Sequence, residues 1–326
     1  MVKVFKKLIS KQFNPFIEKS FSKKHCGFRK GHRTQHALTN MLRKWQKHLN
    51  TSDKVGAILM DLCKAFDCLP HELLIVKLSA YGVSENALRL FNSYLQNRKH
   101  RVHIGSSYSD FLEFLIGVPQ GSVLGPDLFN VFINDLLFSI EETDICNFAD
   151  DDTLHTCNPT IEGVINSLKL DLEIVIRWFR LNGMVANPSK FQVIFPGTRA
   201  EISITIGSFT IKSSKQVKLL GVIIDSELTF YPHIQAICKT VVSKTKALQR
   251  IRFLISQKQA DAIYYTCVMS HFNYCPLIWM FSSKQAHNLI NTTHRKALCA
   301  RLNLFTGELS ELLDITNSLS QFMKKI

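Results

Sequence analysis

The sequence predicts a mixed fold of helices and strands (α+β), and three observations point to it. Residues 55–60 (VGAILM) form a continuous apolar run, which is typical of a strand buried on both faces. Residues 145–156 alternate apolar and polar side chains around Asp150, Asp151 and Asp152, which predicts two strands joined by a tight acidic turn. From Tyr231 onward the pattern is helical.

The composition is that of a folded protein. The chain has 326 residues, 46% of them hydrophobic, and this is enough for two or three compact units. No apolar run approaches the roughly 18 residues of a membrane span, and the basic N-terminus lacks the apolar core of a secretory signal. An organellar presequence is the alternative for this segment, although its basic residues are Lys rather than Arg. The nine cysteines show no CxxC pair and no Cys/His knuckle spacing. We therefore expect no membrane association, no secretion and no zinc site, with free thiols in a reducing intracellular compartment.

The positive charge is unevenly distributed. The net charge is +14, and residues 1–50 alone carry 13 Lys and Arg against one acid, Glu18. Residues 228–260 carry six Lys and Arg and no acid. Two basic blocks on either side of an acidic centre are what a binder of phosphate backbones with a cation-dependent site needs. A basic surface that is merely solvated is the alternative.

Local signals divide the chain into further elements. Pro near the start and Gly just past the end bracket helices, and apolar residues spaced three or four apart mark their buried faces. In chain order we predict a basic amphipathic segment over 1–25, a basic turn over 26–34, a helix over 35–49, a helix between Pro70 and Gly82, a helix capped by Ser84, a strand-like stretch over 98–103, a rigid turn over 117–126, a helix from Pro126, a long helix starting at Asn158 and Pro159, and strands over 191–195, 202–206 and 217–225.

Asp61 and the acidic turn are the candidate metal ligands. Asp61 ends the buried strand, and adjacent carboxylates such as Asp150 and Asp151 repel each other unless a cation neutralises them. Hard cations such as Mg²⁺ take oxygen ligands of this kind. The alternatives are an Asp-rich surface turn and a helix-capping role, to which we assign Asp67. A calcium loop is a poor fit, because no EF-hand spacing surrounds Asp150.

Two loops are candidates for phosphate binding. The turn over 26–34 offers backbone amides together with Arg29, Lys30 and Arg33. The glycine-rich turn over 117–126 presents Gln120 beside Gly121, but it matches neither the Walker nor the dinucleotide fingerprint.

In their order, these motifs resemble the reverse transcriptase domain of non-LTR (LINE-type) retrotransposons, in particular the Jockey-like group. The resemblance covers residues 26 to about 300 and rests on GFRKG, AILMDLCKAFD, YLQNRKHRV, GVPQGSVLGPDLFNVFINDL, FADDDTL, NPSK and VKLLGVIID. It implies a right-hand polymerase with an antiparallel palm sheet, partial fingers and a helical thumb. The implied domains are partial fingers with a basic N-terminal segment over 1–54, a palm with inserted fingers elements over 55–228, and a thumb with a C-terminal extension over 229–326.

The resemblance also implies RNA-directed DNA polymerase activity on an RNA template, a DNA primer and a deoxynucleoside triphosphate (dNTP). Asp61 and Asp150 would hold two Mg²⁺ ions, or Mn²⁺ in their place, with Asp151 as a secondary ligand. Lys190 matches a family lysine proposed to protonate pyrophosphate, and a plain surface lysine is the alternative. Asp152 stands where the family usually has Thr, and we assign it no catalytic role.

Further residues are assigned by the same resemblance. Phe66 occupies the position where an aromatic ring crowds a 2′-hydroxyl, with plain packing as the alternative. Gln120 and Gly121 would lie against the incoming nucleotide and the template. The remaining predicted contacts to nucleic acid are Arg29, Lys30 and Arg33, the turn at Leu220 and Gly221 that would grip the primer end, and Lys244, Lys246 and Arg250 of the second basic block.

The sequence departs from the family in its extent. It starts after the fingers segment around a RPIS-type motif, and it shows neither an endonuclease domain nor a Cys/His knuckle. Cys63 stands where the family usually has Ser. We therefore expect an N-terminally truncated reverse transcriptase, nuclear or cytoplasmic, with reduced activity. The rival interpretation is a catalytically inactive remnant that binds nucleic acid.

Overall fold

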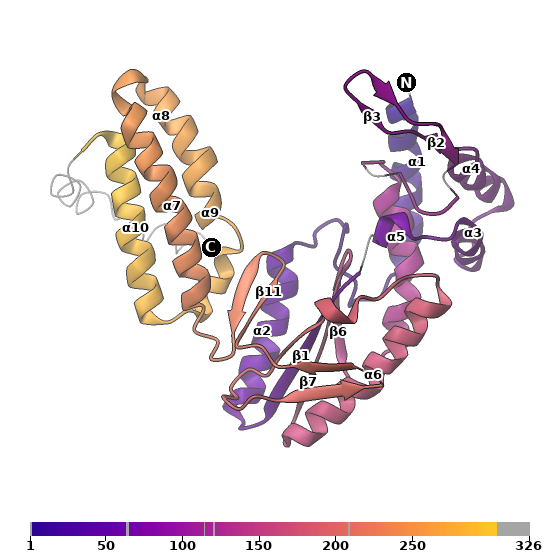
Figure 1. Cartoon of the computed structure of the whole chain (residues 1–326), viewed down its shortest axis with the longest axis horizontal. Coiled ribbons are helices and arrows are strands. Elements are labelled where there is room, and N and C mark those ends of the chain that lie inside the picture. Colours follow the sequence, from indigo (N-terminus) through magenta and orange to yellow (C-terminus); the bar gives the residue numbers. More distant parts are fainter. Residues whose placement is uncertain (1, 63–64, 114, 120, 208, 305–326) are drawn as a thin grey trace. The chain divides into compact units, whose positions relative to one another are not determined.

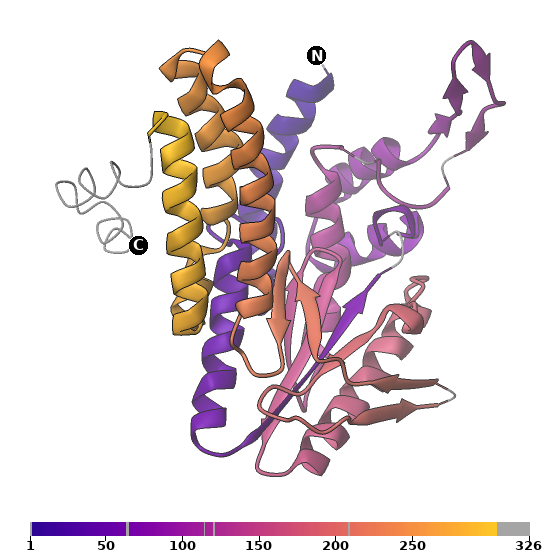
Figure 2. The ribbon, with the colours of Figure 1, turned by 60° about the vertical axis from the view of Figure 1, so that its left-hand side comes forward.

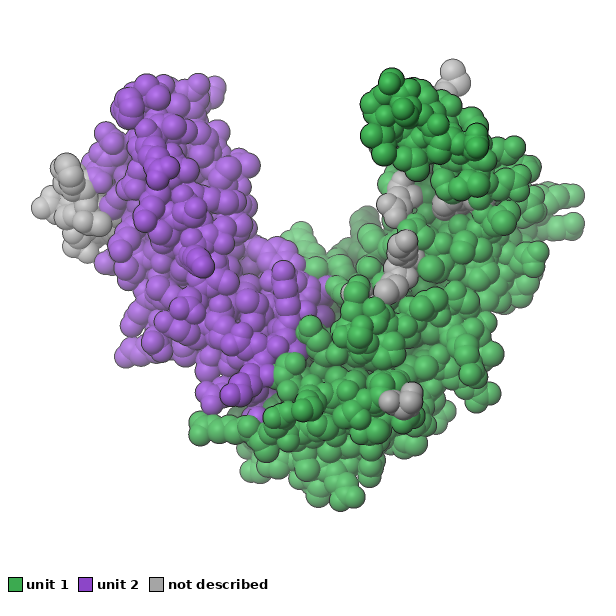
Figure 3. All heavy atoms as spheres, viewed as in Figure 1, with its two compact units in different colours: residues 1–37, 43–195, 199–214 green, residues 38–42, 196–198, 215–326 purple. Residues whose placement is uncertain are grey.

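The computed structural model describes residues 2–62, 65–113, 115–119, 121–207 and 209–304, without the side chains of Val2 and Asp61. The chain forms two compact units (Figure 3). Unit 1 comprises residues 1–37, 43–195 and 199–214, and unit 2 comprises residues 38–42, 196–198 and 215–326. The mixed helix-and-strand class is as predicted. The predicted domain boundaries at residues 54 and 228 stay predictions.

Unit 1 combines a four-stranded sheet with helices and small hairpins. Its elements, counting α2 although residues 38–42 group with unit 2, are α1 (Val2–Ile17), α2 (Thr34–Asn50), β1 (Lys54–Asp61), α3 (His71–Ala80), α4 (Glu85–Leu95), β2 (Lys99–His100), β3 (His103–Ile104), β4 (Ser107–Tyr108), β5 (Leu112–Glu113), α5 (Gly125–Ile133), β6 (Asp144–Phe148), β7 (Asp151–Asn158), α6 (Ile161–Leu181), β8 (Gln192–Ile194), β9 (Ser203–Ile206) and β10 (Phe209–Lys212).

The central sheet explains the apolar run that the sequence shows. Its strand order is β6-β7-β1-β8, and every neighbouring pair is antiparallel. The helix α6 packs on one face of β1 and β7 (Figure 1), so closely that a Cβ at Gly56 would lie 2.5 Å from Cγ1 of Val164. On the other face, Trp45 of α2 lies edge-on to His155 of β7. Strand β1 is therefore covered on both faces and needs apolar side chains on both.

Three predictions about elements of unit 1 need correction. The long helix begins at Ile161 rather than at Asn158, because Thr160 is the N-cap and its side chain accepts a hydrogen bond from the Gly163 amide at 3.1 Å. The stretch 98–103 is not one strand, since β2 pairs with β5 whereas β3 pairs with β4. Ser84 does stand at the N-cap of α4, but its side chain makes no capping hydrogen bond.

Unit 2 is a hairpin followed by helices. Its elements are β11 (Gln216–Leu219), β12 (Val222–Asp225), α7 (Tyr231–Ile251), α8 (Gln257–Ile263), α9 (Ser270–Phe272) and α10 (Lys284–Leu302). The helices α7 and α10 pack against each other along their lengths, as Figures 1 and 2 both show.

The predicted single strand over 217–225 is wrong. Leu220 and Gly221 both adopt a positive φ, of 46° and 80°, and this reverses the chain between β11 and β12. The Asp225 carboxylate then accepts hydrogen bonds from the amides of Thr229 and Phe230, which fixes the entry into α7. No described helix combines the length and apolar character that crossing a membrane requires.

Candidate functional site

The acidic residues gather at one edge of the central sheet. Strand β1 ends there at Asp61, and the antiparallel register places Asp61 opposite Asp151 at the start of β7. Strand β6 ends at the same edge with Phe148, which pairs with Asp151 from the other side. The turn between β6 and β7 therefore contains only Ala149 and Asp150. The prediction that all three acids lie in the turn is wrong for Asp151 and Asp152, because the ladders on both sides of β7 already include them.

The three consecutive acids have different environments. Asp150 and Asp151 are half-buried, whereas Asp152 is 1% exposed. Successive strand residues point to opposite faces, so the side chains of Asp151 and Asp152 leave β7 on opposite faces of the sheet. The described side chains contain no group of three metal-binding residues, and the Asp61 side chain lies outside the described part. Carboxylate oxygens at one sheet edge are nevertheless a donor set that suits Mg²⁺.

Asp152 belongs to a buried polar cluster behind the turn. Its Oδ1 accepts a hydrogen bond from Nδ2 of Asn147 at 2.8 Å. Burial raises the pKa of Asp152 to about 7; the Asn147 hydrogen bond opposes this rise, and the nearby carboxylates of Asp151 and Asp150 add to it. Asp152 therefore lies on the core side of the sheet, and its lack of a catalytic role stays a prediction.

Lys190 lies near the same edge. It ends a 3₁₀ turn over Pro188–Lys190 that packs against β1. One residue beyond Asp61, Leu62 forms a bridge with Ala186. The Lys190 side chain is exposed. The fold thus brings the backbone of Lys190 to the acidic edge although 129 residues separate it from Asp61.

Phe66 has packing partners on both sides. It lies in a 3₁₀ turn, stacks on Phe129 at 4.5 Å between ring centroids, and meets Phe28 edge-on at 5.9 Å. Its carbonyl accepts a hydrogen bond from the Val118 amide at 2.8 Å, which ties it to the glycine-rich loop. Gln120 of that loop lies outside the described residues. Gly121 is exposed with a φ of 70°, a conformation that favours glycine.

The basic turn over 26–34 uses its arginines in different ways. Arg29 donates two hydrogen bonds to Oε1 of Glu18, at 2.8 and 2.6 Å, and further ones to the carbonyls of Ser22 and His25. Its guanidinium therefore holds the loop together. Lys30 and Arg33 are exposed and offer charge to the solvent.

The β11–β12 turn is held by one aromatic residue. The Tyr274 hydroxyl donates a hydrogen bond to the Leu220 carbonyl at 2.6 Å. A Cβ at Gly221 would lie 3.1 Å from the Tyr274 ring. The turn at Leu220 and Gly221 is thus fixed from within unit 2.

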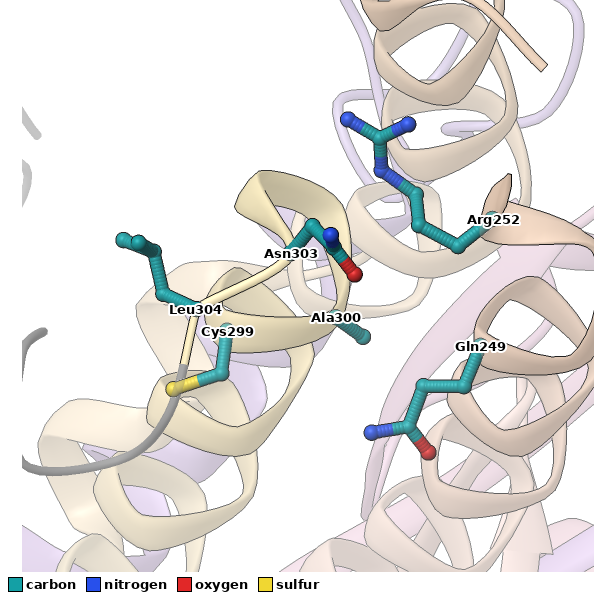
Figure 4. Close-up of a pocket in the computed structure, with 6 residues that line it drawn as sticks. All are labelled: Gln249, Arg252, Cys299, Ala300, Asn303 and Leu304. Atoms are coloured by element: carbon teal, nitrogen blue, oxygen red, sulfur yellow. The ribbon is translucent and has the colours of Figure 1, made fainter. Parts of the chain in front are cut away.

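The basic block of α7 does not form one surface. Lys246 and Arg250 are exposed and four residues apart, so they share a helix face, whereas Lys244 is half-buried with its Nζ 2.8 Å from Nε2 of His271. Lys246 also lines a pocket of about 490 Å³ between α7 and α10, across from Lys296. A neighbouring pocket of about 260 Å³ is drawn in Figure 4, where Gln249 and Arg252 face the end of α10.

Four residues at these sites could not be identified from the sequence. Asn147 reads as one polar position of an alternating strand, and Gly27 and Phe28 read as parts of a phosphate turn. Tyr274 lies 53 residues beyond Gly221, in a segment that no local pattern connects with the hairpin. The positive φ of Phe28, 54°, becomes visible only in the structure.

Comparisons with known proteins agree with the motifs. The family described as "Reverse transcriptase (RNA-dependent DNA polymerase)" matches residues 1–224. The chain is 27% identical over 330 residues to the "Probable RNA-directed DNA polymerase from transposon BS" of Drosophila melanogaster, an alignment covering 91% of this chain and 34% of that protein. It is 26% identical over 294 residues to the "RNA-directed DNA polymerase from mobile element jockey" of Drosophila funebris, covering 86% and 32%. The chain spans about a third of the length of these relatives.

A solved structure shares the fold. Apo telomerase from Candida Tropicalis superposes with a TM-score of 0.52 at 11% sequence identity, covering 92% of this chain and 55% of that one. The predicted right-hand polymerase fold is confirmed at this level. The resemblance to non-LTR retrotransposon polymerases is confirmed by the two relatives from Drosophila.

Proposed function

The chain belongs to the reverse transcriptase family, and we propose that it catalyses RNA-directed DNA synthesis as a non-LTR retrotransposon polymerase. In this reaction the 3′-oxygen of a DNA primer, paired to an RNA template, attacks the α-phosphorus of a dNTP. The new P–O bond forms as the bond to the β-phosphate breaks, the hydroxyl loses its proton, and pyrophosphate leaves.

One observation carries the proposal most directly. The register of β1 and β7 places Asp61 opposite Asp151, with Asp150 in the adjoining turn. Three acidic residues from positions up to 90 residues apart thus have their backbones at one sheet edge. Carboxylates gathered at one place repel one another unless a cation neutralises them. Asp61 and Asp150 would hold two Mg²⁺ ions, or Mn²⁺, with Asp151 beside them. When bound, such ions stabilise charge on the attacking and leaving oxygens.

The residues around the acidic edge have separate tasks in this proposal. The Nζ of Lys190 would give a proton to the leaving pyrophosphate. The half-buried ring of Phe66 would crowd a 2′-hydroxyl and so favour deoxynucleotides; its contacts with Phe129 and Phe28 would hold it rigid for that purpose. Gln120 and Gly121 would lie against the nucleotide and the template.

Exposed cations would bind the template and primer. Lys30 and Arg33 in unit 1, and Lys246 and Arg250 in unit 2, are the exposed members of the predicted set. Phosphate contacts of this kind position a strand without reading its sequence. The turn at Leu220 and Gly221 would support the primer end. We place the protein in the nucleus or the cytoplasm, where its RNA template and dNTPs are present.

The test is primer extension on an RNA template, with binding measured in parallel. The intact chain should extend an annealed DNA primer with dNTPs in the presence of Mg²⁺ and stop when a chelator removes the metal. Binding of the primer–template without any extension in either Mg²⁺ or Mn²⁺ would instead support the inactive remnant.

A further inference from the structure

The turn that carries Asp150 is built on an unusual backbone conformation. Ala149 has a φ of 60°, in the left-handed region that L-residues seldom adopt. A residue held in this region persists only when its surroundings impose the conformation. The contacts around Ala149 therefore decide where the Asp150 carboxylate lies.

Asn147 supplies the first of these contacts. Its side chain is fully buried, and Nδ2 donates both to the Ala149 carbonyl at 2.9 Å and to Oδ1 of Asp152 at 2.8 Å. One amide group thus ties the turn to the strand that follows it. One acceptor precedes Asp150 in the sequence and the other follows it. The Asn147 amide therefore holds the chain on both sides of Asp150.

The segment around Gly27 supplies the second contact. The Cys26 amide donates to the Asn147 carbonyl at 2.9 Å, and Asn130 of α5 holds the Gly27 carbonyl from behind at 3.0 Å. The backbone of Gly27 packs directly against the turn, since a Cβ there would be 2.2 Å from the Ala149 nitrogen. The φ of Gly27 is not positive, so its lack of a side chain serves this close approach rather than a special conformation.

We propose that Asn147 and Gly27 are positioning residues that fix the Ala149–Asp150 turn and thereby set the affinity of the acidic edge for its metal ions. The inference rests on the proposed function, because it takes Asp150 as a metal ligand. Neither residue would touch substrate. Their loss lets the turn relax out of the left-handed conformation, which moves the carboxylate while the basic surfaces stay in place.

The variants that test this are Gly27→Ala and Asn147→Ser. The first pushes the turn with one methyl group, and the second removes both Nδ2 hydrogen bonds. Gly163→Ala is the matched control for the first, since a Cβ there would also press on a neighbour, 2.3 Å from Oδ1 of Asn158, at the end of β7 opposite the turn. Asn134→Ser is the control for the second, because Asn134 is also fully buried and binds the Ser22 amide and the Ser20 carbonyl, away from the turn.

Two readouts separate positioning from stability. Mn²⁺ binding is titrated by electron paramagnetic resonance without substrate, and the Mg²⁺ dependence of primer extension is measured with the affinity for an annealed DNA primer on RNA. We expect both variants to weaken Mn²⁺ binding and raise the half-saturating Mg²⁺ concentration by about tenfold, as loss of a residue that orients a ligand does. Primer–template affinity should stay within about twofold of the controls.

Two results would overturn the inference. Metal titrations of Gly27→Ala and Asn147→Ser that coincide with those of Gly163→Ala and Asn134→Ser would reduce both residues to a structural role. If Gly27→Ala does not fold, Asn147→Ser decides alone. An Asp150→Asn variant run alongside keeps the two levels apart. Undiminished extension by Asp150→Asn refutes the metal-ligand role that the proposed function gives this residue. If Asp150→Asn is inactive while Gly27→Ala and Asn147→Ser behave like their controls, only the positioning role is refuted.

Discussion

Two hairpin turns of the molecule contain residues with a positive φ, and different contacts stabilise them. The β6–β7 turn has a positive φ at Ala149, and the β11–β12 turn has one at Leu220 and at Gly221. The first is held from inside by a buried amide and a glycine contact, the second by the half-exposed Tyr274. Buried hydrogen bonds fix a position more firmly than an exposed one, because water cannot replace them.

This difference suggests a division of tasks. The first turn presents Asp150, whose carboxylate must lie within a fraction of an ångström of its proper place. The second turn is predicted to contact the primer end. Because the primer end moves after every nucleotide addition, this contact must be less rigid than the first turn. Changes to the first turn should therefore affect chemistry and metal dependence, and changes to the second should affect primer binding.

The largest effect is expected at Asp150. Asp150→Asn keeps the shape of the side chain but removes the charge, and extension should fall by at least about 10²–10³-fold, as when one group that stabilises transition-state charge is lost. Primer–template binding should change little, because the cations that carry it lie elsewhere. Single-turnover extension and equilibrium binding check this together. Near-normal extension would show that the acidic edge is not the metal site.

Much of the first turn could be predicted from the sequence. The run over 55–60 and the alternation around Asp150 predicted three strands and the acidic edge, because burial and side-chain period are local properties. The placement of Asp151 and Asp152 in a strand could not be predicted, because Asp is common in turns. Only their pairing with β1 and β6 makes them part of β7.

The supports of both turns were not predictable. Gly27 meets Ala149 across 122 residues, and Tyr274 meets Gly221 across 53. No periodicity encodes such pairings, because they depend on how separate elements pack. Arg29 shows the same limit: its sequence context suits phosphates, whereas its ion pair with Glu18 needs the folded loop.

Acid should loosen the first turn through His25, which packs behind it. Its ring is fully buried beside Asn130 and Asn147, yet neither nitrogen makes a well-formed hydrogen bond. Burial lowers the pKa of His25 to about 4, whereas in the unfolded chain it titrates near 6.5. The stability that neutral His25 provides is thus complete above about pH 6.5 and is lost as the pH falls toward 4, by up to about 3 kcal/mol.

Urea unfolding of the whole chain between pH 7 and 4.5 measures this loss. The variant His25→Leu removes the titrating group and should show a flatter decline of the unfolding free energy than the wild type. Parallel curves for the two proteins would mean that other groups, such as the buried His155, account for the acid sensitivity.

The next largest effect is expected at the exposed cations of α7 in unit 2. Each phosphate contact contributes about 0.7–0.9 to the slope of log affinity against log salt. Replacing Lys246 and Arg250 by Gln together should flatten the slope for primer–template binding by about 1.5. Lys244→Gln is the matched control, because that ammonium contacts His271. Equal slopes for the double variant and the control would mean that this face of α7 does not meet nucleic acid.

The smallest effect is expected at the second turn itself. Tyr274→Phe keeps the ring against Gly221 but loses the hydrogen bond to the Leu220 carbonyl, a contact that contributes about 0.5–1.5 kcal/mol. The KM for primer–template should rise by about 2- to 10-fold, with kcat and the half-saturating Mg²⁺ concentration unchanged. Gly221→Ala should act in the same direction, since its φ of 80° strains any L-residue and its Cβ would press on Tyr274. Steady-state extension at varied primer–template and varied Mg²⁺ gives both quantities from one preparation. If Tyr274→Phe shifted the metal dependence and left the KM alone, the second turn would be serving the acidic edge as well, and the division of tasks between the two turns would be wrong.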